Sequence, residues 1–220
     1  ADGDWSSDVC SSDLRATPPG QGSLTSPLVG LPIEFIGSFP DSDHRLDPVL
    51  PEVAFLGRSN VGKSSLINAL AGQKIARTSG TPGKTQQLNA FRFPTFYLID
   101  LPGYGYAKLP KTERRRLRAL VDAIIRARPT LTAVVWLLDI RHRPSKEDFD
   151  MSDLLADGGR ETIVVLTKAD KLSQSQRSKA IQDRAGELGL DPELLMATSS
   201  SKGSGVVELG EVIVDLRSEE

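Results

Sequence analysis

The chain has 220 residues, of which 39% are hydrophobic and 25% are charged, and its formal net charge is −2 at neutral pH. This composition is ordinary for a globular protein and leaves room for one α/β domain but not for two large ones. Because the net charge is close to zero, any nucleic-acid binding has to come from a local basic patch. Cys10 is the only cysteine, which excludes a disulfide framework and a cysteine-based metal site.

No apolar run reaches the roughly 20 residues that span a bilayer. The N-terminus also lacks the basic and apolar segments of a secretory signal. We therefore expect a cytoplasmic protein without a membrane partner.

Residues 1–32 differ from the rest of the chain. The tripeptide Ser-Ser-Asp occurs twice, a Pro/Gly-rich stretch follows, and neither a helical nor a strand period is present. We interpret this segment as a disordered tail or as an extension that is not native protein. The folded domain is expected over residues 33–218.

From residue 51 onward, short β-rich runs alternate with amphipathic helical patterns. In chain order we predict a strand over 51–57, a helix over 63–72, two short strand runs within 91–100, a helix over 111–128, a strand over 132–140, a helix over 144–158, a strand over 162–168, a helix over 173–189, a strand over 193–200 and a helix over 205–218. Pro94 divides the runs within 91–100, which is typical of a hairpin at a sheet edge. The alternation predicts right-handed crossovers and therefore an α/β fold with a doubly wound, mostly parallel sheet.

The segment GRSNVGKS, residues 57–64, matches the pattern G-x-x-x-x-G-K-[ST] and lies between a predicted strand and a predicted helix, as a phosphate-binding loop requires. Its glycines let successive backbone N–H groups curl around phosphate oxygens, and the helix N-terminus adds its positive end. We expect Lys63 to reach the β- and γ-phosphates and the Ser64 hydroxyl to bind Mg²⁺. The predicted binding residues of this loop are Gly57, Arg58, Ser59, Asn60, Val61, Gly62, Lys63 and Ser64.

The segment DLPG, residues 100–103, closes the next apolar strand. An acid at the carboxyl end of a strand faces the phosphate crevice. We therefore expect Asp100 to hold the Mg²⁺ shell through water and the Gly103 N–H to sense a γ-phosphate. Leu101 and Pro102 complete this predicted binding segment.

The segment TKAD, residues 167–170, indicates which base is bound. Guanine presents two N–H donors that one carboxylate accepts, whereas adenine presents an acceptor that would repel Asp170. Lys168 is expected to lie over the base plane. After the last strand, the backbone N–H groups of Ser199 and Ser200 are expected to meet the guanine O6. The predicted guanine-binding residues are Thr167, Lys168, Ala169, Asp170, Thr198, Ser199 and Ser200.

Residues 77–87, RTSGTPGKTQQ, form a polar Gly/Pro-rich segment able to order around a γ-phosphate. It offers two threonines that could bind Mg²⁺, Thr81 and Thr85, and spacing alone does not choose between them.

Several of these segments together resemble one family. PEVAFLGRSNVGKSSLINAL, ARTSGTPGKTQ, DLPGYGYAK and LLDIRHRPSKEDFDM resemble the EngB (YihA/YsxC-type) family of bacterial ribosome-assembly GTPases, within the TrmE–Era-like translation-factor class, over about residues 33–218. The resemblance implies a Ras-like P-loop GTPase fold, a three-layer arrangement around a six-stranded mixed sheet. It also implies GTP or GDP with Mg²⁺ as ligands and the large ribosomal subunit, its rRNA and its proteins, as partner. A role in subunit assembly and in normal cell division and septation follows from the same resemblance.

The resemblance selects Thr85, in the sequence GKTQ, as the Mg²⁺ ligand beside Ser64. The binding residues that it implies in this segment are Gly83, Lys84, Thr85, Gln86 and Gln87. Residues 1–32 match nothing in the family pattern, and the guanine loop departs from it by beginning with Thr198 and a run of serines.

A Ras-type enzyme carries a glutamine after its D-x-x-G motif, whereas this chain has Tyr104. We therefore expect slow intrinsic turnover, or turnover that depends on another group. Asn60 is similar to a loop asparagine of potassium-stimulated relatives, so one hypothesis places K⁺ beside it; the other is that Asn60 only tolerates an unusual backbone conformation. The predicted catalytic residues are Lys63, Thr85, Gly103 and Asn60.

The helix predicted over 111–128 carries four arginines away from its apolar stripe, namely Arg114, Arg115, Arg116 and Arg118. They form either a solvated face or a contact for rRNA phosphates. A nucleotide or small-molecule kinase is an alternative function, but it has no need of TKAD. A second alternative function is that of a signalling GTPase unrelated to the ribosome. Such a GTPase is expected to carry a C-terminal lipidation site, which we do not find. We expect a monomer that does not bind DNA.

Overall fold

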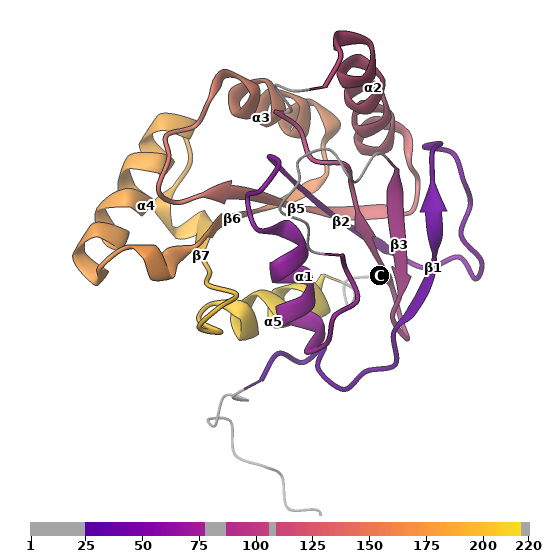
Figure 1. Cartoon of the computed structure of the whole chain (residues 1–220), viewed down its shortest axis with the longest axis horizontal. Coiled ribbons are helices and arrows are strands. Elements are labelled where there is room, and N and C mark those ends of the chain that lie inside the picture. The colour runs from indigo at the N-terminus through magenta and orange to yellow at the C-terminus, as the bar shows by residue number, and fades with distance from the viewer. Residues whose placement is uncertain (1–24, 78–86, 106–108, 217–220) are drawn as a thin grey trace, which may run out of the picture.

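A computed structural model describes residues 25–77, 87–105 and 109–216 (Figure 1). Most of the expected tail, residues 1–24, lies outside the described residues. The same holds for both candidate threonines of the polar segment and for Gly83, Lys84 and Gln86.

One seven-stranded sheet forms the centre of the molecule, in the order β1-β3-β4-β2-β5-β6-β7. Its strands are β1 (Glu34–Phe39), β2 (Glu52–Gly57), β3 (Leu88–Arg92), β4 (Tyr97–Asp100), β5 (Leu131–Asp139), β6 (Glu161–Thr167) and β7 (Leu195–Ala197). The β1–β3 and β3–β4 pairs are antiparallel and the others are parallel. The mixed, mostly parallel sheet that the sequence predicts is therefore confirmed.

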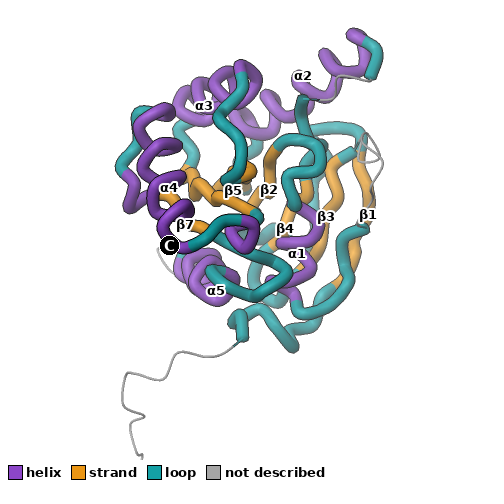
Figure 2. The backbone as a smooth tube through the Cα atoms, turned by 60° about the vertical axis from the view of Figure 1, so that its left-hand side comes forward, coloured by secondary structure: helices purple, strands orange, loops and turns teal. Residues whose placement is uncertain are grey.

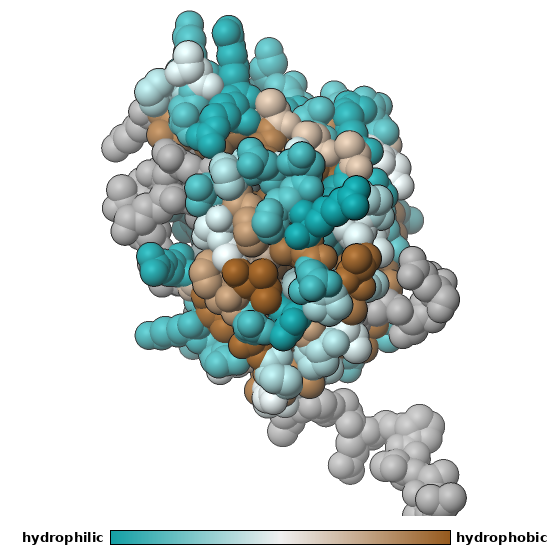
Figure 3. Space-filling model, turned by 90° about the vertical axis from the view of Figure 1, so that its right-hand side faces the viewer, coloured by the Kyte–Doolittle hydropathy of each residue, from teal (hydrophilic) through white to brown (hydrophobic). Residues whose placement is uncertain are grey.

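The expected count of six strands was one too few, because β1 was not recognised. No residue of β1 is fully buried, and the Phe35 side chain is 58% exposed, so the strand lacks the apolar run that marked the others. Pro94 does lie between two paired strands, β3 and β4, but β1 covers their outer side. The hairpin is thus inside the sheet and not at its edge. Figure 3 views the β1 side of the molecule, where hydrophobic side chains lie among hydrophilic ones.

In the part of the chain that the structure describes, five α-helices cover the two faces of the sheet (Figures 1 and 2). They are α1 (Lys63–Ala71), α2 (Lys111–Ala127), α3 (Lys146–Gly158), α4 (Gln174–Leu188) and α5 (Val206–Asp215). Buried side chains of α2, α3 and α4 share one core cluster, and those of α1 and α5 share the other. Each predicted helix is present, and the predicted apolar stripe of α2 is its buried face.

The strand β2 shows how the sheet separates the two cores. Val53 and Phe55 belong to the α1/α5 cluster, while Ala54 and Leu56 belong to the α2/α3/α4 cluster. Since all four are fully buried, the strand reads as a continuous apolar run. Strands β2, β4, β5, β6 and β7 run parallel, so their carboxyl ends meet at one edge of the sheet, which is where the functional loops begin.

The chain packs against the domain before residue 33, where the domain was expected to begin. Leu28 is completely buried in the α1/α5 cluster. A Cβ added to Gly72 would lie 2.9 Å from Val29, and one added to Gly210 would lie 2.8 Å from Pro27. The described residues just before 33 therefore form part of the α1/α5 side.

Candidate nucleotide-binding site

The loop after β2 has the backbone form of a phosphate cradle. Asn60 and Gly62 have positive φ angles of 62° and 109°, and the helix α1 begins directly afterwards at Lys63. Gly57 has no room for a side chain, because a Cβ there would lie 2.9 Å from both the Leu137 carbonyl oxygen and Val61 Cγ1. Glycine at both positions is therefore required by conformation or by close packing.

The N-terminus of α1 is open in a way that the other helices are not. Its N-cap, Gly62, offers no side-chain hydrogen bond, and its first turn has no acidic residue. Helices α3 and α4 close their own N-termini with capping boxes, and α2 and α5 carry a glutamate in the first turn. The free backbone N–H groups and positive end of α1 are thus available to an anion.

Lys63 and Asp100 come together at this helix end. They form a direct ion pair, and both side chains are more than nine-tenths buried. Asn89 on β3 donates a 3.4 Å hydrogen bond to the other carboxylate oxygen of Asp100. These groups suit a magnesium nucleotide. The Lys63 ammonium can bind phosphate oxygens, and the Asp100 carboxylate and the nearby Ser64 hydroxyl are oxygen ligands of the kind that Mg²⁺ takes. Within the described ranges no group of three His, Cys, Asp or Glu could hold a metal ion by itself.

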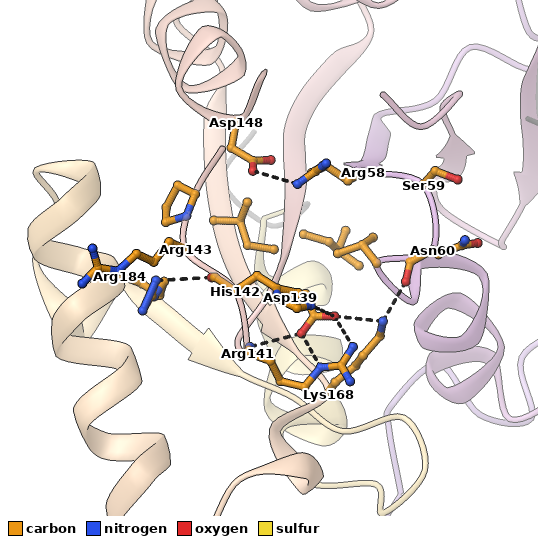
Figure 4. A pocket seen from close by; sticks show the side chains of 14 residues that line it. Arg58, Ser59, Asn60, Asp139, Arg141, His142, Arg143, Asp148, Lys168 and Arg184 are labelled. Atoms are coloured by element: carbon orange, nitrogen blue, oxygen red, sulfur yellow. Dashed lines mark hydrogen bonds and ion pairs between the residues drawn. The ribbon is translucent and has the colours of Figure 1, made fainter. Parts of the chain in front are cut away.

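The guanine segment is tied to the phosphate loop. The Thr167 hydroxyl at the end of β6 donates to the Val61 carbonyl oxygen over 2.7 Å. Lys168, which has a positive φ of 62°, donates to the Asn60 carbonyl oxygen over 2.7 Å and forms a 2.9 Å ion pair with Asp139 (Figure 4). These contacts hold the base-binding and phosphate-binding segments at a fixed spacing.

Asp170 is held in its charged form. The Ser199 hydroxyl donates a 2.7 Å hydrogen bond to it, and Lys171 lies 3.1 Å away. These partners lower the pKa of Asp170 to about 2, with the Ser199 hydrogen bond as the largest cause. The carboxylate is therefore ionised at neutral pH, as an acceptor for two guanine N–H donors must be.

The loop after β7 bears on the expectation that the backbone N–H groups of both Ser199 and Ser200 meet the guanine O6. The Ser199 backbone N–H donates to the Ser204 carbonyl oxygen over 2.9 Å, so it is engaged within the loop and does not face a base. Of the two expected donors, only the Ser199 N–H has such a partner among the described backbone hydrogen bonds, and the contact of the Ser200 N–H with the guanine O6 stays a prediction. Ser199 acts instead through its hydroxyl on Asp170, a role that the sequence did not reveal. Thr198 is buried, and its hydroxyl has no hydrogen-bond partner among the described residues.

Tyr104 does not take the place of the missing glutamine. Its hydroxyl donates a 2.8 Å hydrogen bond to Asp148 near the start of α3 and accepts a 2.8 Å bond from Trp136 Nε1. Burial and the neighbouring Asp148 raise the pKa of Tyr104 well above its ordinary value, so the phenol stays protonated. Arg58 in the phosphate loop lies 3.9 Å from the other oxygen of Asp148.

Sequence reasoning missed the residues behind this network, Asp148 and Trp136, and also Asp139. One signal existed for Asp148. It lies three residues after Ser145, the N-cap of α3, and the two side chains form a capping box, which the pattern S-x-x-D indicates. No local pattern pointed to Asp139. Its carboxylate forms an ion pair with Arg141, two residues further along, and the fold adds a second ion pair with the distant Lys168.

The structure brings most predicted site residues to one edge of the sheet. They are the loop 57–64, Asp100 to Gly103, residues 167–170 and residues 198–200. Gln87 is exposed and directly precedes β3. Thr85 and its neighbours from 83 to 86 lie outside the described residues, so their place in the site stays a prediction.

Comparison with known proteins agrees with this geometry. The family profile "50S ribosome-binding GTPase" matches residues 52–168. A probable GTP-binding protein EngB from Gemmatimonas aurantiaca is 42% identical, over 84% of this chain and 92% of its own length. One from Exiguobacterium sibiricum is 45% identical, over 82% and 95%.

A solved structure gives the same result. The crystal structure of a probable GTP-binding protein engB matches with a TM-score of 0.67 and 25% identity, and the match covers 77% of this chain and all of that one. Among the described helices of the present chain, none is long and apolar enough to pass through a lipid bilayer.

Proposed function

The chain belongs to the EngB family of GTP-binding proteins, P-loop GTPases that hydrolyse GTP, and on that premise we propose that it is a GTP-dependent switch that assists assembly of the large ribosomal subunit. The observation that carries the guanine part is the carboxylate of Asp170, held by the Ser199 hydroxyl in a segment that Thr167 and Lys168 hydrogen-bond to the phosphate loop. The ribosomal part rests on the family match. A cytoplasmic location, a monomeric state and a need for the protein in cell division and septation belong to the same proposal.

In the proposed complex, each segment of the edge has one task. Asp170 accepts the guanine N1–H and amino donors, and Lys168 covers the base. The backbone N–H groups of the loop 57–64 and the Lys63 ammonium bind the phosphates. Ser64 and Thr85 are the proposed Mg²⁺ ligands, and Asp100 contributes through water. Bound Mg²⁺ supplies neutralisation of the phosphate charge.

Hydrolysis then depends on what replaces the glutamine of Ras-type enzymes. The Tyr104 hydroxyl already has two partners, Asp148 and Trp136, and is not free to orient water. The Gly103 N–H would donate to the γ-phosphate. Neither this N–H nor the Tyr104 hydroxyl would activate a water molecule. We therefore propose slow intrinsic turnover that a cation or a ribosomal group accelerates.

K⁺ is the proposed cation, with Asn60 as its protein ligand. Asn60 is exposed and has a positive φ of 62°, which asparagine tolerates better than most residues. Its carbonyl oxygen is engaged by Lys168, while its side-chain amide points away from that contact (Figure 4). The amide is therefore the part of Asn60 that could contribute to a cation site.

The first half of α2 is a proposed rRNA contact. Arg114, Arg115 and Arg116 are exposed, but Arg116 pairs with Glu113 over 3.2 Å. Arg118 is half-buried and donates to the Asp150 carbonyl oxygen over 2.8 Å. Arg114 and Arg115 are therefore the stronger candidates for phosphate contacts. Charge reversal of Arg114 and Arg115 should weaken subunit binding and reduce its dependence on salt.

Cosedimentation with purified large subunits tests the proposal. We expect the protein to pellet with large subunits when it carries a non-hydrolysable GTP analogue, and to pellet less with GDP. Small subunits serve as the matched control. Equal pelleting with both nucleotides, or no preference for the large subunit, would contradict the proposed function.

A further inference from the structure

A cavity of about 410 Å³ lies beside the phosphate loop (Figure 4). Residues Arg58 to Val61 form one wall, and the connection between β5 and α3 forms the opposite wall together with Arg184 of α4. Leu137, Leu138 and Val61 give it an apolar lining. Lys168 and the loop residues Arg58 to Val61 belong both to this lining and to the proposed nucleotide site, whereas Lys63, Ser64, Asp100 and Asp170 do not line the cavity. The cavity therefore adjoins the nucleotide site and shares one wall with it.

The cavity carries more positive than negative charge. Its lining cations are Arg58, Arg141, Arg143, Arg184 and Lys168. The carboxylates that form ion pairs with these five cations are three, Asp139, Asp148 and Glu187. Two of the three carboxylates are shared by two cations each, which leaves an excess of two positive charges before His142 is counted.

Of the arginines that line the cavity, Arg143 is the most accessible to an incoming group. The Arg143 side chain is 83% exposed and has a single ion-pair partner, Glu187. Arg184 is 8% exposed, and its buried Nε has no hydrogen-bond partner among the described residues. Arg58, on the opposite wall, is held to Asp148 only by a long 3.9 Å ion pair. Arginines thus line the cavity on both sides, and the Arg143 guanidinium is the most exposed of them.

We propose that this cavity binds one nucleotide of an RNA strand, with its phosphate between the arginines and its sugar or base on the apolar lining. Guanidinium groups bind phosphate through paired N–H donors, and the volume exceeds what a phosphate alone would fill. A carboxylate of an acidic peptide would leave the apolar lining uncovered. The inference rests on the proposed function, because the ribosome supplies the RNA.

The test uses the full chain and a fluorescein-labelled single-stranded RNA of twelve uridines. Arg143→Glu should lower RNA affinity at least tenfold while leaving basal GTP hydrolysis unchanged, because within the described ranges Arg143 pairs with Glu187 and with no residue of the proposed nucleotide site. Arg143→Ala should reduce the slope of log affinity against log salt by about 0.7, the value for one phosphate contact on a single strand. Lys179→Glu, the same charge change at an exposed position of α4 outside the cavity, is the control and should bind as the wild type.

Three outcomes would overturn the inference. RNA binding by Arg143→Glu at wild-type strength would do so, as would an equal loss in Lys179→Glu. Competition by uridine 5′-monophosphate as effective as competition by unlabelled RNA would assign the cavity to a free nucleotide instead. Cosedimentation of the wild-type protein with large subunits separates the two proposals. If the wild type does not pellet with them, the proposed function is removed. If it pellets and Arg143→Glu still binds RNA at wild-type strength, only this inference is removed.

Discussion

The Tyr104 hydroxyl donates a 2.8 Å hydrogen bond to Asp148, 44 residues further along the chain. This contact joins the segment after DLPG to the first turn of α3. Because Asp148 also faces Arg58 and caps α3 through Ser145, one carboxylate connects the phosphate loop, the DLPG segment and the wall of the cationic cavity.

Tyr104→Phe should lower the free energy of unfolding by about 1–3 kcal/mol, because Trp136 Nε1 would lose its acceptor in a buried setting. Urea denaturation measures this change. Tyr97→Phe is the control, since the Tyr97 hydroxyl donates to the carbonyl oxygen of the exposed Pro48 and its loss leaves no buried indole N–H without an acceptor, so it should cost less. A larger loss in Tyr97→Phe than in Tyr104→Phe would contradict the network described here.

The ionisation of Asp170 should not change the affinity for a fluorescent GDP analogue between pH 7.5 and 5.5. The pKa of Asp170 is lowered to about 2, below the ordinary value of about 3.9 for aspartate, so its interactions are fully present above pH 4 and are lost only as the pH falls toward 2.

Asp170→Asn should weaken GDP binding at least tenfold, because charge-assisted hydrogen bonds contribute about 1.5–3 kcal/mol each. Unchanged GDP affinity in Asp170→Asn would remove Asp170 from the guanine site.

Gly205→Ala should disrupt the guanine loop, since a Cβ there would lie 2.3 Å from the Ala197 carbonyl oxygen. Gly203→Ala is a matched control: its φ of 74° is close to the 71° of Gly205, but a Cβ would meet nothing within 4 Å. Both variants share the backbone strain, and only Gly205→Ala adds the clash. GDP affinity should therefore fall clearly more in Gly205→Ala, and equal losses would count against this explanation.

Arg128→Met should destabilise the domain by about 3–5 kcal/mol. Arg128 forms a buried ion pair with Glu52, and its removal leaves that carboxylate buried with Thr130 as its remaining side-chain hydrogen-bond donor. Glu52 lies at the start of β2, at the far end of the strand from the nucleotide site. Denaturation should report the loss while GDP affinity below the unfolding transition stays as in the wild type; a parallel loss of affinity would show that the two ends are coupled.

GTP hydrolysis with large subunits present should be faster in KCl than in NaCl if Asn60 helps to hold K⁺. Asn60→Gly removes the amide but keeps the positive φ and the carbonyl oxygen that Lys168 needs. We expect this variant to lose the difference between the two salts. Equal wild-type rates in KCl and NaCl would leave Asn60 with only its backbone role.

The sequence alone was sufficient for the helices, the parallel strands and the phosphate and guanine motifs. The physical reason is that these features are local. A buried parallel strand is a continuous apolar run, α2 shows a 3.6-residue stripe, and the backbone of 57–64 follows from where its glycines stand. The edge strand β1 was missed for the same reason, because it buries too little to leave a pattern.

Only the tertiary structure decided which partners these groups have. The Ser199 N–H is consumed within its own loop, its hydroxyl holds Asp170, and Tyr104 turns toward Asp148 and not toward the nucleotide. The Ser199–Asp170 and Tyr104–Asp148 contacts join residues 29 and 44 positions apart, and nothing in the spacing of either partner encodes them. The sequence determined which chemical groups stand at the ends of the strands, whereas contacts between the loops, and of one loop with α3, determined which partners those groups have.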